Sequence, residues 1–133
     1  MVPIVFEIPI ELSDKKDVLV VWEAWRDIRS EDRSSIILEA YGEDGGSIAQ
    51  ALGVTYDEAI EQQVLPYAVQ PMNRRGEADP EAVRNAMIRQ GGILFGDKKV
   101  DLRFPSLQLA QDAFERLVQD LPTGYWSIVQ TNS

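Results

Sequence analysis

The sequence predicts a single α+β domain over residues 1–133, with a ferredoxin-like arrangement. Two observations predict it. Each end of the chain has the pattern of a strand, then of a helix, then of a second strand, and the first strand of each group alternates apolar and polar residues. In this fold two strand-helix-strand units form one four-stranded antiparallel sheet with both helices on one face. We expect these units at 1–41 and 100–133, separated by a mainly helical insert with a short hairpin strand at 42–99.

The first unit begins with a strand pattern, because every even-numbered residue from 2 to 12 is apolar. Pro3 and Pro9 cannot donate backbone hydrogen bonds, so the fully paired part is expected at 4–8. Apolar residues in 18–28 recur three and four positions apart and predict an amphipathic helix. The β-branched and apolar stretch 36–41 predicts the second strand.

The insert is expected to carry elements of its own, because a structureless loop of this length is uncommon in a compact domain. Residues 47–52 predict a short helix, and Thr55 with Glu58 matches a capping box at the start of a second helix. Asp79 and Pro80 match the cap and first position of a third helix. The other expected pieces are a short extended segment at 65–72 and a hairpin whose strands, 93–95 and 100–104, flank the turn 96–99.

The second unit repeats the order of the first. Residues 100–104 alternate as a strand, and 106–121 has apolar residues at helical spacing. The Pro-Thr-Gly sequence at 122–124 ends that helix, and 125–130 has the aromatic and β-branched content of a strand.

An open, mostly parallel α/β sheet of three layers is the alternative fold, since helix patterns also separate the middle elements. It ranks second because interior parallel strands are apolar on both faces. The stretches 2–12 and 100–104 alternate instead.

The composition narrows the chemistry. The chain has no cysteine and no histidine, which excludes a disulfide framework, a thiolate metal site and the Ser-His-Asp and Cys-His arrangements. No cofactor and no metal site is predicted. A formal net charge of −9 disfavours contact with nucleic acid and with anionic lipid. The start of the sequence does not resemble a signal peptide and the longest apolar run, 18–22, is too short for a membrane span, so we expect a cytoplasmic protein.

Residues 47–60 resemble the helix-turn-helix family of DNA-binding segments. Ala49 and Gly53 match the small packing residue and the turn glycine of that family, and three further positions match its apolar residues: Ile48, Leu52 and Val54. The resemblance implies a DNA-associated module. However, the second helix would present carboxylates to the phosphates, and no Lys or Arg. A helical hairpin that packs on the sheet is therefore favoured.

The leading functional hypothesis is a non-catalytic interaction or regulatory protein that acts through protein–protein contact, with a homodimer as the expected assembly. Trp22 and Trp25 share a helix face in this interpretation, and an exposed tryptophan would mark an interface. The candidate interaction residues are Trp22, Trp25, Trp126, Arg74 and Arg75.

A third hypothesis is an enzyme that uses carboxylates or lysine. Paired carboxylates can work as acid and base when burial separates their pKa values, but no spacing in the sequence shows such a pair. The candidates are Glu58, Glu61, Lys98, Lys99, Tyr41 and Tyr67.

Overall fold

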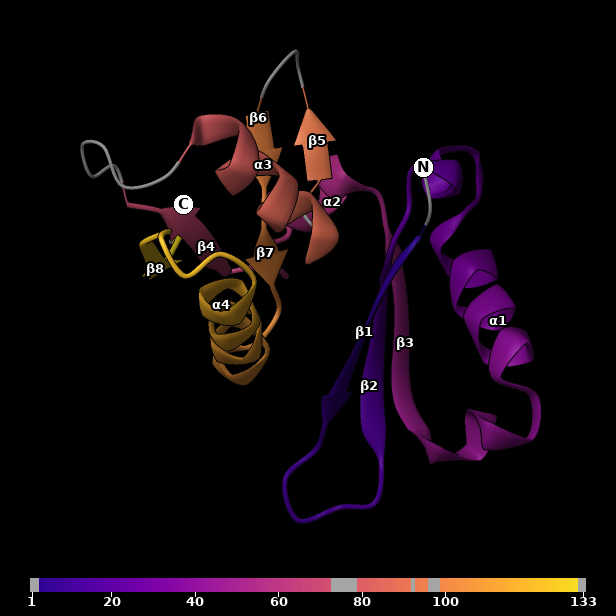
Figure 1. Cartoon of the computed structure of the whole chain (residues 1–133). Helices are drawn as coiled ribbons and strands as arrows, with labels where there is room; N and C mark the ends of the chain where they lie inside the picture. The colour runs from indigo at the N-terminus through magenta and orange to yellow at the C-terminus, as the bar shows by residue number, and fades with distance from the viewer. Residues whose placement is uncertain (1–2, 73–78, 92, 96–98, 132–133) are drawn as a thin grey trace. The chain divides into compact units, whose positions relative to one another are not determined.

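The structure, a computed structural model, describes residues 3–72, 79–91, 93–95 and 99–131. It is a mixed α+β structure whose described residues form two three-stranded sheets, a two-stranded sheet and four α-helices (Figure 1). The chain divides into two compact units, 1–64 and 65–133. Each unit is described separately below.

The first unit is built on the sheet β1-β2-β3, in which β1 pairs antiparallel with β2, and β2 pairs parallel with β3. The connection from β2 to β3 consists of a 3-10 helix, an α-helix and a second 3-10 helix, and a short α-helix follows β3. The elements are β1 (Ile4–Pro9), β2 (Lys16–Val21), η1 (Glu23–Asp27), α1 (Ser30–Tyr41), η2 (Gly42–Ser47), β3 (Ile48–Val54) and α2 (Tyr56–Glu61).

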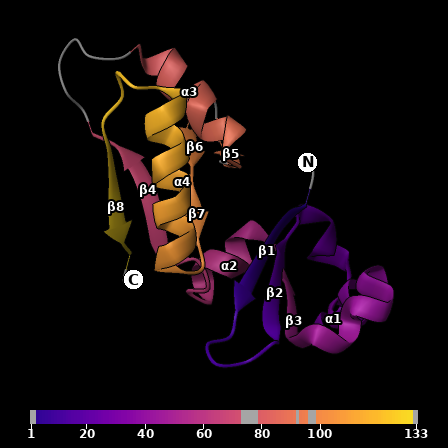
Figure 2. The ribbon, with the colours of Figure 1, turned by 60° about the horizontal axis from the view of Figure 1, so that its bottom comes forward.

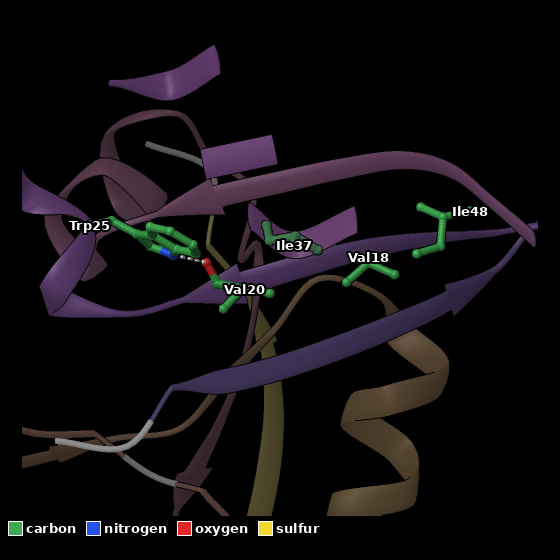
Figure 3. Packing of buried hydrophobic residues seen from close by; sticks show 5 residues of the cluster. All are labelled: Val18, Val20, Trp25, Ile37 and Ile48. Carbon is green, nitrogen blue, oxygen red and sulfur yellow. Dashed lines mark hydrogen bonds between the residues drawn. The ribbon is translucent and has the colours of Figure 1, made fainter. Parts of the chain in front are cut away.

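The core of the first unit lies between α1 and one face of this sheet. Figure 3 shows side chains of β2, η1, α1 and β3 pointing toward one another. Trp25 is 2% exposed, and its indole Nε1 donates a hydrogen bond to the carbonyl oxygen of Val20 at 3.2 Å. The buried members of this cluster are Val18, Val20, Trp25, Ile37 and Ile48.

The second unit is built on the sheet β7-β4-β8, in which both outer strands run antiparallel to the central strand β4. The outer strands are therefore parallel to each other, and α4 connects them (Figure 2). Its elements are β4 (Tyr67–Pro71), α3 (Pro80–Arg89), β5 (Ile93–Phe95), β6 (Lys99–Asp101), β7 (Arg103–Phe104), α4 (Leu107–Asp120) and β8 (Trp126–Gln130). The buried face of α4 consists of Ala110, Ala113 and Leu117.

Several sequence predictions are confirmed. The capping box starts α2, where the Thr55 hydroxyl accepts from the Glu58 amide and the Glu58 carboxylate accepts from the Thr55 amide. Pro80 lies in the first turn of α3. The first strand, the extended segment at 65–72, the β5–β6 hairpin and the helix and strand at the end of the chain are also found. The predicted strand at 100–104 is instead divided between β6, which pairs with β5, and β7, which pairs with β4.

Three predicted elements are wrong. The predicted helix at 18–28 is β2 followed by η1, because the residues of 18–21 are buried in the middle strand of a sheet, where apolar runs do not alternate. The predicted strand at 36–41 belongs to α1, whose buried residues are Arg33 and Ile37. The predicted helix at 47–52 forms β3, where pairing with β2 outweighs the helical preference of its Ala, Gln and Leu residues.

The ferredoxin-like four-stranded sheet is not confirmed, because the strands of the described residues belong to separate sheets. The open, mostly parallel sheet is not found there either, since β2–β3 is the one parallel ladder among the described strands. The single domain over 1–133 stays a prediction. No helix in the described part of the chain is both long enough and apolar enough to cross a membrane.

We predict that Gly53→Ala destabilises the first unit by about 1–3 kcal/mol, because the added methyl group would overpack the core. A Cβ at residue 53 would lie 2.9 Å from Trp25 Cε2, and 3.1 Å from both Trp25 Nε1 and Arg33 Cβ. Gly46→Ala is the matched control, since nothing lies within 4 Å of its added Cβ. Urea unfolding followed by circular dichroism measures both variants, and equal midpoints for the two would contradict the prediction.

Candidate functional site

Arg33 on α1 forms the most connected polar cluster of the first unit. The residue is 5% exposed, and its guanidinium donates from all three nitrogens. Nε donates to the carbonyl oxygen of Ile28 at 2.7 Å, and Nη2 to that of Trp25 at 2.7 Å. Nη1 donates to the carbonyl oxygen of Gly53 at 3.2 Å and to Glu58 Oε1 at 2.7 Å. One side chain therefore connects α1 to η1, β3 and α2.

Glu58 completes this cluster as a structural carboxylate. Its Oε1 accepts from the Thr55 amide at 2.8 Å as well as from Arg33. These bonds, first that from the Thr55 backbone and then that from Arg33, hold the pKa of Glu58 below its ordinary value. Glu58 is consequently ionised at neutral pH and does not have the raised pKa of a general acid.

A second polar cluster joins β1, β2 and the last residue of α1. The Tyr41 hydroxyl donates to Glu7 Oε2 at 2.9 Å, and Lys16 Nζ forms an ion pair with the same oxygen. Lys16 Nζ also lies 5.2 Å from the centre of the Tyr41 ring. The hydrogen bond from Lys16, and to a smaller extent that from Tyr41, lowers the pKa of Glu7. Burial, and to a smaller extent the hydrogen bond to Glu7, raises the pKa of Tyr41 to about 12. At neutral pH the phenol stays protonated and serves as a donor.

Where the structure describes them, the candidate catalytic residues have separate surroundings, and Tyr67 lies on β4 of the second unit. Glu58 and Tyr41 belong to two different clusters, and Glu61 is an exposed residue of α2. Lys98 lies outside the described residues, and the side chain of Lys99 is not described either. Within the described ranges, no three acidic side chains lie close enough to hold a metal ion.

The predicted interaction residues are divided between core and surface. Trp25 and Trp126 are buried, at 2% and 5% exposure. Trp22 is half-buried and contacts Trp25 edge to face, with ring centres 5.2 Å apart. Trp22 is thus the one tryptophan of the three that is partly exposed to solvent. Arg74 and Arg75 lie outside the described residues.

The helix-turn-helix interpretation of 47–60 is wrong. Residues 48–54 form β3, so the first helix of such a motif is absent from this segment. Gly53 does not form a turn between helices. It lies on the strand, where its backbone packs closely against Trp25. A DNA-binding role for this segment is therefore not supported.

The free edges of the two three-stranded sheets are the other feature that can bind a partner, because an unpaired edge exposes backbone donors and acceptors. On β1 the amide of Ile10 donates to Lys15 at 3.1 Å, beyond the end of the ladder. Hydrogen bonding alternates along an antiparallel pair. The backbone amide and carbonyl groups of the even residues of β1 therefore point toward β2, and those of the odd residues point outward from the sheet edge. Pro3 and Pro9 have outward parity, so they bracket the β1 edge with residues that cannot donate.

The β3 edge is closed by side chains of α1. The Trp22 amide donates to the carbonyl oxygen of Val54 at 2.9 Å. The backbone groups of the even residues of β3 therefore point toward β2, and those of the odd residues point outward. Two of these outward carbonyl groups are already occupied. Ala51 accepts from the Ser34 hydroxyl at 2.9 Å, and Gly53 accepts from Arg33.

The two edges of the second sheet differ. β7 contains only Arg103 and Phe104 and is followed by Pro105, so it offers a very short edge. β8 is a five-residue strand without proline or charge, and no described strand pairs with its outer side. The adjoining residues up to Thr131 are uncharged as well, and Val129 is 37% exposed. Among the described strands of the two sheets, β8 alone has an edge that is longer than two residues, contains neither proline nor charge, and has no outward carbonyl group occupied by a described side chain.

Sequence reasoning placed the last strand but did not identify its edge as a candidate binding surface. The signal was present, because an uncharged strand in a chain of net charge −9 lacks the lysines and prolines that usually protect edges. Which strand lies at an edge follows from sheet order, and that order is not written in any local pattern.

Comparisons with protein-family models, with curated proteins and with solved structures find no match for this chain.

We predict that Arg33→Met destabilises the first unit by about 3–5 kcal/mol, because Glu58 and three carbonyl groups lose a buried cationic partner. Arg29→Met is the control, since the side chain of Arg29 is 77% exposed and forms an ion pair with Asp32, three positions along the chain, at 3.4 Å. That variant should change stability by less than about 0.5 kcal/mol. Urea unfolding of both variants checks this, and a small effect at Arg33 would show that the cluster is dispensable.

We predict one tyrosine ionisation near pH 12 in the unmodified protein, and its loss in the variant Tyr41→Phe. The pKa of Tyr41 is raised from 10.0 to about 12, so its contribution to stability is present below pH 10 and is lost as the pH rises toward 12. The ultraviolet absorbance of tyrosinate, titrated in both proteins, measures the difference. A difference between the two curves that is centred near pH 10, the ordinary tyrosine value, would contradict the assignment. Circular dichroism at each pH shows whether the chain stays folded.

Proposed function

We propose that this chain is a non-catalytic interaction or regulatory protein that acts through protein–protein contact, with a second copy of the chain as its expected partner. The observation that carries the proposal is the unblocked, uncharged edge of β8. Backbone groups along such an edge bind another strand regardless of its sequence. This mode of contact needs neither imidazole nor thiol chemistry, and the chain has neither.

The polar clusters support the same proposal. Glu58 and Glu7 are held ionised by donors that connect helices to strands, and Tyr41 is held protonated. These groups stabilise the first unit through bonds between its elements. Their positions fit structural roles better than catalytic ones.

The size and charge of the contact set its expected strength. A single pair of edge strands buries less than the roughly 1,200 Å² of a standard stable interface, so the association should be weak and concentration-dependent. Two chains of net charge −9 also repel each other at low ionic strength. Raising the salt concentration from about 0.01 M to about 0.15 M shortens the Debye length from about 30 Å to about 8 Å, and should strengthen the dimer.

Sedimentation equilibrium tests the proposal. We expect a reversible monomer–dimer equilibrium that Val129→Glu weakens by about tenfold or more, which corresponds to about 1.4 kcal/mol, because a carboxylate on the edge would be desolvated in the contact. Val118→Glu is the matched control, since Val118 lies on α4 of the same unit at 44% exposure, against 37% for Val129. A strict monomer at the highest soluble concentration would refute the expected partner.

A further inference from the structure

The direction in which the backbone of β8 points is fixed by hydrogen bonds just beyond the two ends of its ladder with β4. The Met72 amide donates to the carbonyl oxygen of Tyr125 at 2.8 Å, and the Thr131 amide donates to that of Pro66 at 2.7 Å. Both bonds continue the register of the ladder, in which Val69 faces Ile128. Since hydrogen-bonded and non-hydrogen-bonded pairs alternate, the odd residues of β8 bond to β4.

The even residues of β8 therefore direct their amide and carbonyl groups away from β4. They are Trp126, Ile128 and Gln130, spaced two apart, and none is a proline. Burial of the Trp126 side chain does not close this edge, because the groups that face outward belong to the backbone. Figure 2 shows β8 as an outer strand of its sheet, with β4 along one of its sides.

The geometry points to an antiparallel pairing of β8 with β8 of a second copy, about a two-fold axis that passes beside Ile128. This inference rests on the proposed function and names the surface of contact. In this register Ile128 faces its own counterpart, and Trp126 faces Gln130 of the other copy. Each of these facing pairs exchanges two backbone hydrogen bonds, so every outward donor of the strand meets an acceptor.

Neighbouring registers use the strand less fully. If Ser127 faced itself, Gln130 would face Gly124, beyond the start of the strand. If Val129 faced Val129 of the other copy, no residue of the partner strand would face Trp126. The register centred on Ile128 is the one in which all five residues of both strands overlap.

The charge distribution explains why the partner is a second copy. The chain carries a formal charge of −9, yet no charged residue lies on β8, so two copies can meet here without facing carboxylates across the contact. The β1 and β3 edges carry prolines and occupied carbonyl groups, and β7 is too short to build a ladder. Pairing at β8 would join two β7-β4-β8 sheets into one continuous sheet.

Disulfide trapping tests the register, because the chain has no cysteine of its own. Residues 127 and 129 of opposite copies would form non-hydrogen-bonded pairs with Cα atoms about 4.5 Å apart, within the range of a disulfide. Under oxidation, a mixture of Ser127→Cys and Val129→Cys proteins should give a mixed disulfide dimer. Isotope labelling of one variant identifies that species by mass spectrometry.

Each variant alone provides the first control. Two copies of either cysteine would lie on a diagonal, with Cα atoms about 7–8 Å apart, which is too far for a disulfide. The cross-linked species should therefore be lost when either variant is oxidised alone. Gln111→Cys mixed with Val118→Cys, both exposed on α4, controls for random collision and should give no specific dimer.

The outcomes separate this inference from the proposed function. A mixed disulfide that exceeds both single variants and the α4 control supports pairing centred on Ile128. A dimer in sedimentation without that mixed disulfide, or with self-linked Ser127→Cys, overturns the register while the proposed function stands. A strict monomer in sedimentation overturns both.

Discussion

The first unit depends on the buried guanidinium of Arg33. A charged group in a protein interior destabilises the fold unless its donors are matched, and here every nitrogen has an acceptor. The acceptors come from η1, β3 and α2, so one side chain fixes the position of three elements against α1. Lysine could not replace it, because an ammonium group lacks the planar fork that reaches carbonyl groups in several directions. The low pKa of Glu58 is the electrostatic counterpart of the same arrangement.

The same residue also shapes which surfaces remain open. When Arg33 bonds to Gly53 and Ser34 bonds to Ala51, α1 closes the outer edge of β3 as well as covering the face of the sheet. Prolines limit the β1 edge, and shortness limits β7. Protecting an edge strand restricts which residues the strand can contain. The lack of such protection on β8 therefore indicates that its edge is a candidate contact surface. Proline, occupied carbonyl groups or short length protect the edges of β1, β3 and β7 in turn. None of these features protects β8, so the fold permits a contact there.

How much could be predicted from the sequence depended on whether the signal was local. Thr55 and Glu58 define a helix start through neighbouring residues, and the strand-helix-strand order after residue 100 has clear breaks at Pro105 and Gly124. The errors lie where sheet order decides. The buried run 18–21 has no alternation because it is a middle strand, and β3 is a strand because β2 pairs with it. The partners of Arg33 are up to 25 positions away, so no spacing rule could reveal them.

A search by side-chain type was therefore bound to overlook the candidate surface. It looked for imidazole, thiol, paired carboxylates and exposed indoles, whereas the groups of β8 that no other described strand pairs with are backbone amides and carbonyls. Their availability depends on what is missing nearby: proline, charge and a neighbouring strand. For a small acidic chain, this is also the type of contact that charge opposes least, because backbone dipoles carry no net charge. A recognition surface made of main chain is consistent with a sequence in which charged side chains such as Arg33 and Glu58 hold its own elements together.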